Sequence, residues 1–212
     1  MRTLFLMLIL RPLLFLVART WVGGGGHMPA AGPAILAANH NSHLDTLVIL
    51  CQFPIGAAHL VRPVAAADHF IKSPLSSWFY RRMFGVVAID RRDTKKGAAV
   101  LDECRAALAR GEILLIYPEG TRGHSDRIGP LKGGIARLSM DFPDAPVVPV
   151  YVHGTRRILP RRATLPAPGA CAVTFGRSVY WAGNRRTFMR ALRTALEQLQ
   201  SDAAKARLCI RG

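Results

Sequence analysis

The run Ile113-Leu114-Leu115-Ile116-Tyr117 is apolar at every position. A strand with one face in water alternates apolar and polar residues, so a run without alternation indicates a strand covered on both faces, as in parallel sheets. Other short apolar runs alternate with helical patterns from about residue 34 onward. We therefore predict an α/β fold, a single domain with a largely parallel central sheet flanked by helices. The predicted strands are 34–38, 58–62, 86–90, 113–117, 147–152 and 171–175, and the predicted helices are 43–52, 69–83, 95–110, 132–140 and 187–200.

The composition favours a folded protein with an acidic partner. Half of the 212 residues are hydrophobic, which argues against disorder, and the length suits one domain with a proper core. The formal net charge is +16, and arginine supplies most of the excess. Because guanidinium groups suit phosphate and carboxylate, we expect anionic lipid, a phosphorylated substrate or nucleic acid as the partner. The alternative from a different class is a basic module without catalysis that binds nucleic acid or membranes. Two features argue against nucleic-acid binding: aromatic residues make up only 8% of the chain, and they do not interleave with the basic ones.

The four cysteines do not form a metal-binding pattern. They are widely separated in the sequence and include no C-x-x-C, so a structural zinc site is not expected. Their spacing is compatible with free thiols in a reducing compartment. The four are Cys51, Cys104, Cys171 and Cys209.

The N-terminal segment is strongly apolar. From Leu4 to Val17 only Arg11 and Pro12 interrupt the apolar run. A helix of that length is about 21 Å long, whereas the hydrocarbon core of a bilayer is about 30 Å thick. We therefore predict a short membrane-associating helix that precedes the domain. The predicted division is a membrane-associating segment at 1–22, a Gly-rich linker at 23–33 and a folded domain at 34–212.

The basic and aromatic residues of this segment fit an interfacial position. Arg2, Arg11 and Arg19 are expected at headgroup level, and Trp21 at the membrane interface. Two alternatives remain open. A signal peptide would also begin with a basic residue before an apolar run, although no A-x-A cleavage pattern follows before Arg19. The segment is also long enough to be a core helix of the domain.

A histidine and a carboxylate lie five residues apart where the first predicted strand ends. His40 follows strand 34–38, and Asp45 begins the next helical pattern. A histidine at such a junction is accessible, and a nearby carboxylate fixes its tautomer and raises its basicity. This arrangement is suited to activating a hydroxyl nucleophile.

Two other interpretations of the same residues stay open. Ser42 and Asp45 fit a capping box, with Ser42 as the N-cap and Asp45 as the third helical residue. In addition, His40, His43 and Asp45 partly match the H-x-H-x-D-H zinc pattern, although Thr46 stands where its last histidine would be.

Other predicted strands also end in polar residues. Arg91 follows strand 86–90, and Arg122 follows strand 113–117 within a loop that contains Gly120. Either arginine alone would be an ordinary polar residue in a turn after a buried strand. Taken together they are more informative, because functional groups of parallel sheets gather at the carboxyl ends of strands. A glycine lets backbone amides approach an anion, and arginine binds phosphate through two donors.

Four blocks, in this order, resemble the bacterial glycerolipid acyltransferase family, whose type member is 1-acylglycerol-3-phosphate (lysophosphatidate) acyltransferase. Any one block is a weak signal, whereas the ordered set is specific. The blocks are Asn39-His40-Asn41-Ser42-His43-Leu44-Asp45, Gly85-Val86-Val87-Ala88-Ile89-Asp90-Arg91, Tyr117-Pro118-Glu119-Gly120-Thr121-Arg122-Gly123 and Val148-Pro149-Val150, and Leu131-Lys132-Gly133-Gly134 is similar to the segment that follows the third.

The resemblance implies that an acyl group moves from acyl-CoA or acyl carrier protein to the hydroxyl of a lysophospholipid. The expected acceptor is 1-acylglycerol-3-phosphate, which gives phosphatidate. Glycerol-3-phosphate, a lyso-ornithine lipid or another lysolipid are the alternatives. Neither a metal nor a redox cofactor is implied, and no nucleic acid. The implied location is the cytoplasmic face of the bacterial inner membrane, at an anionic bilayer surface.

The resemblance also implies a role for each site residue. His40 would be the general base, and Asp45 would orient it. Arg91 and Arg122 would hold the acceptor's phosphate, together with amides around Gly120. Glu119 would bind the glycerol backbone or lock the loop. The implied substrate-binding set is Arg91, Glu119, Gly120, Thr121 and Arg122.

Overall fold

The structure is a computed structural model of the chain. It describes residues 2–66, 78–89, 100–121, 123, 127–160, 163 and 165–210.

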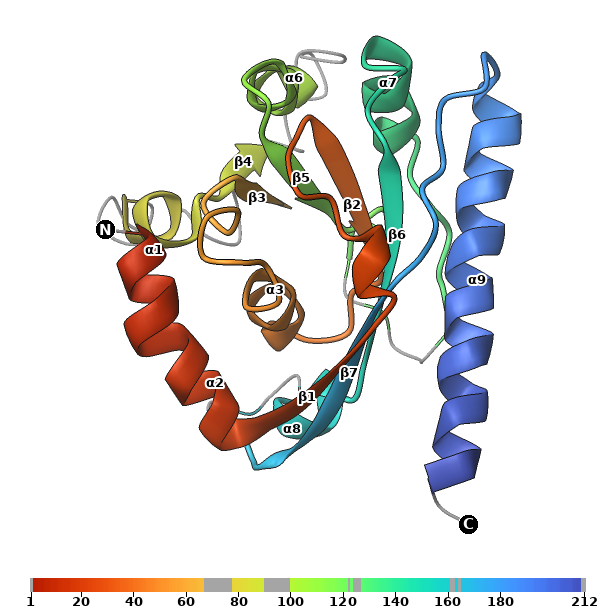
Figure 1. The fold of residues 1–212 in the computed structure, drawn as a ribbon. Coiled ribbons are helices and arrows are strands. Elements are labelled where there is room, and N and C mark those ends of the chain that lie inside the picture. The colour runs from red at the N-terminus through yellow and green to blue at the C-terminus, as the bar shows by residue number, and fades with distance from the viewer. Residues whose placement is uncertain are drawn as a thin grey trace.

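A seven-stranded sheet forms the centre of the fold, in the order β1-β7-β6-β2-β5-β3-β4 (Figure 1). Neighbouring strands run parallel except β6 and β7, which are antiparallel. The prediction of a largely parallel sheet is therefore confirmed. The strands are β1 (Ala18–Gly23), β2 (Ala34–Ala38), β3 (Val61–Ala66), β4 (Val87–Ile89), β5 (Ile113–Ile116), β6 (Val147–His153) and β7 (Gly169–Phe175).

Helices cover both faces of this sheet (Figure 1). The N-terminal helical segment and α3 pack on one face, and α6, α7 and α9 pack on the other. The helices are α1 (Arg2–Phe5), η1 (Leu6–Leu10), α2 (Arg11–Val17), η2 (Gly25–His27), α3 (Leu44–Leu50), η3 (Tyr80–Phe84), α6 (Asp102–Ala109), α7 (Gly134–Asp141), α8 (Thr155–Ile158) and α9 (Arg185–Ile210).

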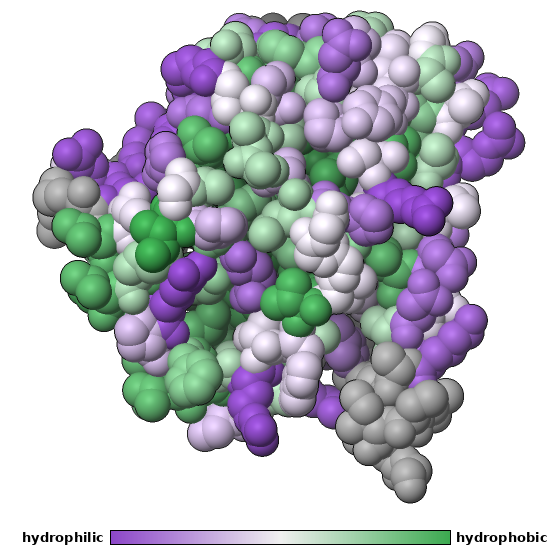
Figure 2. Space-filling view, viewed as in Figure 1, coloured by the Kyte–Doolittle hydropathy of each residue, from purple (hydrophilic) through white to green (hydrophobic). Residues whose placement is uncertain are grey.

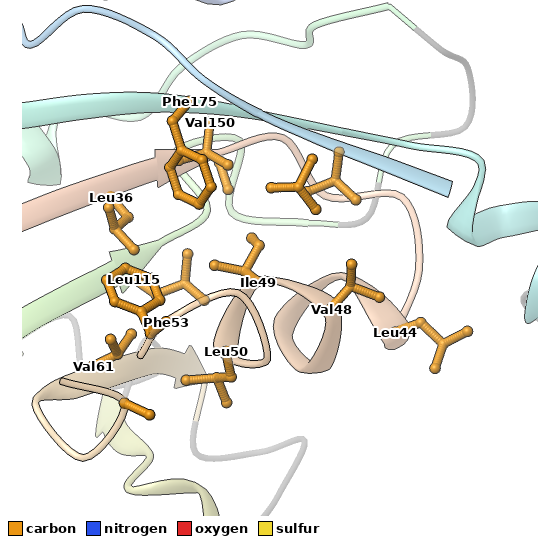
Figure 3. Packing of buried hydrophobic residues seen from close by; sticks show 14 of the residues in the cluster. Leu36, Leu44, Val48, Ile49, Leu50, Phe53, Val61, Leu115, Val150 and Phe175 are labelled. Atoms are coloured by element: carbon orange, nitrogen blue, oxygen red, sulfur yellow. The ribbon is translucent and has the colours of Figure 1, made fainter. Parts of the chain in front are cut away.

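The central strands are buried on both sides, which accounts for their unbroken apolar sequences. In β5, Leu115 faces the cluster under α3, whereas Leu114 faces the cluster under α6 and α7. Figure 3 shows the first of these clusters, in which Phe53 and Ile49 from the α3 region pack against Leu36 of β2. Burying each such side chain stabilises the fold by about 1.5–3 kcal/mol.

Several predicted boundaries differ from the observed ones. Strand β2 has the predicted limits, but β3 begins at Val61 instead of residue 58 because residues 55–60 form turns. Helix α9 extends ten residues beyond the predicted end, to Ile210. Most of the helix predicted at 69–83, and the start of the one predicted at 95–110, lie outside the described residues.

Strand β1 corrects the interpretation of residues 18–26. We expected Arg19 and Trp21 in a membrane anchor and a flexible glycine hinge after them. Instead, Ala18–Gly23 pairs in parallel with β7 over six residues. Gly24 then turns the chain with a φ of +65°, and a Cβ there would collide with the carbonyl oxygen of Phe175. The start of the glycine run is thus a tight turn against the sheet.

The two N-terminal arginines also differ from their predicted position at headgroup level. Both guanidinium groups donate to backbone carbonyl oxygens in the connection between α3 and β3 or at the start of β3. The bonds run from Arg2 to His59 and Val61, and from Arg11 to Cys51 and Phe53. Burial lowers the pKa of Arg2 to about 10, and the neighbouring charge of Arg62 adds to the decrease. These bonds hold the N-terminal helical segment against the domain.

This segment presents two different faces. Leu6, Leu10 and Leu14 are buried in the core, as the core-helix alternative requires. Phe15 and Leu16 are 83% and 74% exposed, as a membrane-facing surface requires. Figure 2 shows hydrophobic side chains gathered over α1 and α2, at the lower left. In the part of the chain that the structure covers, none of the helices combines the length and apolarity needed to cross a bilayer.

Candidate functional site

Asn39 fixes the position of the loop that follows β2. Its side-chain Nδ2 donates to the carbonyl oxygen of Val152 at 2.9 Å, and its Oδ1 accepts from the Val152 amide at 2.6 Å. These two bonds continue the pairing of β2 with β6 beyond the last strand residue. The ends of the two strands are therefore held together, and their loops share one site.

His40 and Asp45 form the predicted pair. Nδ1 of His40 lies 3.0 Å from Oδ2 of Asp45, which is fully buried in the first turn of α3. The carboxylate can only accept, so the proton of this bond is on Nδ1, and Nε2 carries a free lone pair. The His40 side chain retains 18% exposure, so its ring is not sealed inside the protein.

Asp45 accepts three further hydrogen bonds. The backbone amides of Asn41 and Ser42 donate to Oδ2 at 2.6 and 2.7 Å, and the hydroxyl of Thr155 donates to Oδ1 at 2.5 Å. All donors at Oδ2 are N–H groups of the same loop. The carboxylate therefore fixes the loop conformation and the imidazole orientation together.

The capping-box interpretation holds in part. Asp45 accepts from the Ser42 amide, as an acidic residue of a capping box does. However, α3 begins at Leu44, and the Asp45 amide donates to the backbone carbonyl oxygen of Ser42 instead of to its hydroxyl. The Ser42 hydroxyl accepts from the Leu44 amide and donates to the carbonyl oxygen of Leu159. One carboxylate thus stabilises the helix start and contacts the histidine.

Two residues of this site were not predicted from the sequence. Thr155 follows β6 and is fully buried, 110 positions after Asp45 in the chain. The only available signal was its position after a strand end. Tyr117 stacks on the imidazole of His40, with ring centroids 4.0 Å apart and planes at 22°. The sequence did not indicate this stacking, because Tyr117 is the last residue of the apolar run 113–117 and was assigned to the predicted strand.

Tyr117 is anchored by its hydroxyl. This group lies 2.7 Å from Oγ1 of Thr46. Loss of water around the buried phenol raises the pKa of Tyr117 well above its usual value, and the charge of Asp45 adds to the increase. The phenol therefore stays protonated, and it forms a rigid wall beside the histidine ring.

Glu119 connects the two loops of the site. Its Oε1 accepts from the His40 amide at 3.2 Å, and its Oε2 accepts from the Gly129 amide at 2.8 Å. The Gly123 amide donates to the His40 carbonyl oxygen at 2.8 Å. The backbone of His40 is thus held on both sides by the loop after β5. Of the two roles implied for Glu119, this geometry matches the one that locks the loop.

The Gly120 turn needs a glycine. Its φ is +74°, and a Cβ there would come within 2.8 Å of the side chain of Lys132. The amide of Lys132 donates to the Pro118 carbonyl oxygen at 2.7 Å. Thr121 is exposed next to this turn.

The sequence of the chain between β1 and the end of β6 matches a known family. Residues 20–153 match the model of the family described as Acyltransferase. This chain belongs to the acyltransferase family.

Curated relatives of this acyltransferase are named 1-acyl-sn-glycerol-3-phosphate acyltransferases. A chloroplastic protein of Brassica napus is 29% identical over 67% of this chain and 39% of its own length. The alpha form of Ovis aries is 28% identical over 73% of this chain and 52% of its own length. A probable member from Mycoplasma pneumoniae is 30% identical over 57% of this chain and 44% of its own length. The chain thus spans about half or less of the length of these relatives.

A solved structure shares the fold. The 1-acyl-sn-glycerophosphate acyltransferase PlsC of Thermotoga maritima superposes with a TM-score of 0.71 at 22% sequence identity. The superposition covers 94% of this chain and 81% of that one. The shared fold therefore extends well beyond residues 20–153, the segment that matches the family model.

The remaining predicted site residues of this acyltransferase are Arg91 and Arg122. Both lie outside the described residues, so their phosphate-binding role stays a prediction. Across the described residues, three or more His, Cys, Asp or Glu side chains do not come together in a way that could hold a metal ion. The zinc interpretation of His40, His43 and Asp45 therefore has no geometric support.

The thiols described by the structure are poor nucleophiles. Cys51, Cys104 and Cys171 are free. Burial raises the pKa of Cys51 to about 11 and that of Cys104 to about 12. Because the thiolate is the reactive form, these groups are unsuited to forming an acyl-enzyme.

Proposed function

We propose that this acyltransferase moves a fatty acyl group from a thioester to the hydroxyl of 1-acylglycerol-3-phosphate, which gives phosphatidate. The observation that carries the proposal is the bond between His40 and the buried Asp45, in a loop fixed by the third sequence block. The family membership and the names of the relatives support the reaction class.

The proposed chemistry needs one base and no covalent intermediate. The acceptor hydroxyl gives its proton to Nε2 of His40 while its oxygen attacks the thioester carbonyl carbon. The tetrahedral intermediate then collapses, the C–S bond breaks, and the thiolate takes the proton back from the imidazolium. Asp45 holds the ring in the reactive tautomer and stabilises the imidazolium. Tyr117 and Glu119 act as positioning residues, since they contact the ring and the backbone of His40.

Substrate recognition completes the proposal. Arg91 and Arg122, with amides near Gly120 and Thr121, hold the acceptor's phosphate. The donor is acyl-CoA or acyl carrier protein, whose thioester is activated enough that neither a metal nor a redox cofactor takes part. The net charge of +16 supports an anionic partner of this kind.

The exposed apolar surface supports membrane association. This outer face, defined by Leu4, Leu8, Leu13, Phe15 and Leu16, is contiguous along one helical segment. Monomeric soluble proteins rarely expose large apolar patches, and apolar helix faces are buried when they lie in a lipid interface. We propose that the outer face rests in the anionic cytoplasmic surface of a bacterial inner membrane, from which both lipid substrates reach the site.

Membrane association is tested by co-sedimentation with vesicles of phosphatidylglycerol and phosphatidylcholine. The double variant Leu8→Glu/Phe15→Glu should remain in the supernatant, whereas the native chain sediments. Met140→Glu is the matched control, because Met140 is exposed on α7, away from the outer face. Equal sedimentation of all three proteins would contradict the assignment of the outer face.

The reaction is tested with labelled acyl-CoA and a panel of acceptors. The panel contains 1-acylglycerol-3-phosphate, glycerol-3-phosphate, lyso-ornithine lipid and lysophosphatidylcholine, with product analysis. His40→Ala should reduce kcat by about 10²–10⁴ while the melting temperature changes little. His27→Ala, at an exposed histidine, is the control. Turnover by His40→Ala at the native rate would refute the proposed base.

The acceptor site is tested separately. Arg122→Ala should raise the KM for 1-acylglycerol-3-phosphate and leave that for acyl-CoA unchanged. An unchanged acceptor KM would remove Arg122 from the phosphate site.

A further inference from the structure

A pocket lies beside the Gly120 turn, on the face of the sheet covered by α6 and α7. Its volume is about 460 Å³. Most of its wall is apolar and includes Val64, Leu101, Ile116 and Leu138. The side chain of His40 does not line this pocket, but Tyr117 and Gly120 do. The pocket is therefore next to the catalytic histidine and distinct from it.

Three cationic side chains line the same pocket, and no described acidic residue pairs with them. Lys132, Arg137 and Arg185 are all exposed, and the structure gives none of their charged groups an ion pair or hydrogen bond with a described residue. They come from three different elements: the loop after β5, α7 and the start of α9. Three like charges around one cavity repel each other, and this arrangement becomes favourable when an anion is bound.

We propose that this pocket binds a phosphate ester that is joined to an apolar chain. The two arginines and Lys132 bind the phosphate, and the apolar wall holds the chain. The inference rests on the proposed function, because such an ester is present in both of its reactants. One is the lysolipid, with its phosphate and its acyl chain. The other is the acyl donor, with phosphate groups on its pantetheine arm.

The chemistry of the lining favours this ligand over other anions. Guanidinium groups bind phosphate through two parallel donors, and the amino-terminal end of α7 adds a partial positive charge at Gly134. A free phosphate ion would leave the apolar wall in contact with water, whereas a fatty acid would lack the second negative charge. The volume lies within the usual range for sites that hold a small organic ligand, about 300–1,000 Å³.

The first experiment measures binding without turnover. Native protein is titrated with dodecyl phosphate, and with dodecyl maltoside as the uncharged analogue, both below their micelle concentrations. The double variant Arg137→Gln/Arg185→Gln should bind dodecyl phosphate at least about tenfold more weakly, as expected for lost charged hydrogen bonds. Arg190→Gln, an exposed arginine of α9 outside the pocket lining, is the matched control and should bind as the native protein does. Equal binding by native protein and double variant would overturn the proposal.

The second experiment identifies which reactant uses the pocket. The KM values for 1-acylglycerol-3-phosphate and for acyl-CoA are measured separately, each with the other substrate saturating. A rise of about tenfold in the acceptor KM of the double variant identifies the lysolipid phosphate, and a similar rise in the donor KM identifies the donor phosphates. Weaker dodecyl phosphate binding with both KM values unchanged would overturn the assignment to a reactant. The two proposals can fail separately. If the native protein binds dodecyl phosphate through both arginines but acylates none of the acceptors, the proposed function is refuted and the proposed binding site is retained.

Discussion

Replacing Asp45 with asparagine separates its catalytic role from its role at the helix start. Three N–H donors converge on Oδ2, from His40, Asn41 and Ser42. The amide oxygen of an asparagine must therefore take this position, and its NH₂ group then faces the hydroxyl of Thr155, which can accept. Asp45→Asn thus keeps the hydrogen bonds of the loop and the tautomer of His40, and it removes only the negative charge.

The loss of charge has a calculable effect on the rate. Two unit charges about 4 Å apart interact by about 4 kcal/mol at an effective dielectric constant of 20. Because the amide oxygen still accepts the bond from His40, we expect about 2–4 kcal/mol less stabilisation of the imidazolium. At about 1.4 kcal/mol for each factor of ten, kcat should fall by about thirtyfold to a thousandfold. Asp45→Ala should lose more activity and also about 3–5 kcal/mol of stability, since it leaves buried donors unpaired.

The assay combines turnover with denaturant unfolding. Steady-state kinetics with acyl-CoA and 1-acylglycerol-3-phosphate give kcat, and urea titration gives the free energy of unfolding. Asp144→Asn serves as the control, because Asp144 is exposed and the structure shows no partner for it among the described residues. Native kcat in Asp45→Asn would show that the carboxylate acts only as a helix cap. A loss of stability equal to that of Asp45→Ala would refute the hydrogen-bond argument.

Further predictions concern the N-terminal segment, the Gly120 turn and the thiols. Arg11→Met removes the bond to the Cys51 carbonyl oxygen and should lower the unfolding free energy by about 1–3 kcal/mol, measured by urea titration; an unchanged value would mean that this contact does not hold the helix. Gly120→Ala should cost about 1–2 kcal/mol in backbone strain and displace Lys132, so kcat/KM should fall, and native kinetics would show that the turn tolerates a side chain. Burial raises the pKa of Cys51 from 9.0 to about 11, so the stability that this thiol contributes is fully present below pH 9 and is lost as pH rises through 11. At pH 8, Cys51 and Cys104 should react with a disulfide reagent far more slowly in native than in urea-unfolded protein, and equal rates would contradict their burial.

The sequence was informative where one local pattern controls one element. An unbroken apolar run such as Ile113–Tyr117 requires cover on both faces, and the two core clusters provide it. The pair of His40 and Asp45 could also be predicted from the sequence. The two residues are five positions apart at a strand-to-helix junction, so both side chains belong to one loop. Sequence position also implied that several strand ends share one edge.

Contacts between segments that are distant in the sequence could not be predicted from local patterns. Strand β1 has a short, partly polar sequence, and only its pairing with β7 makes it a strand. Arg2 and Arg11 resembled interfacial arginines because their acceptors are backbone carbonyls, which any residue supplies. Thr155 follows β6 and reaches Asp45 because β6 pairs with β2, a pairing that Asn39 extends.

The pairing of β1 with β7 also affects the order in which the protein can fold during synthesis. Thr20 and Cys171, which face each other across these strands, are 151 residues apart. At ribosomal rates of about 5–20 residues per second, the first strand waits roughly 8–30 s for its partner. The pairing of β1 therefore becomes possible only after β6 and β7 have been synthesised, which makes it a late step of folding during synthesis.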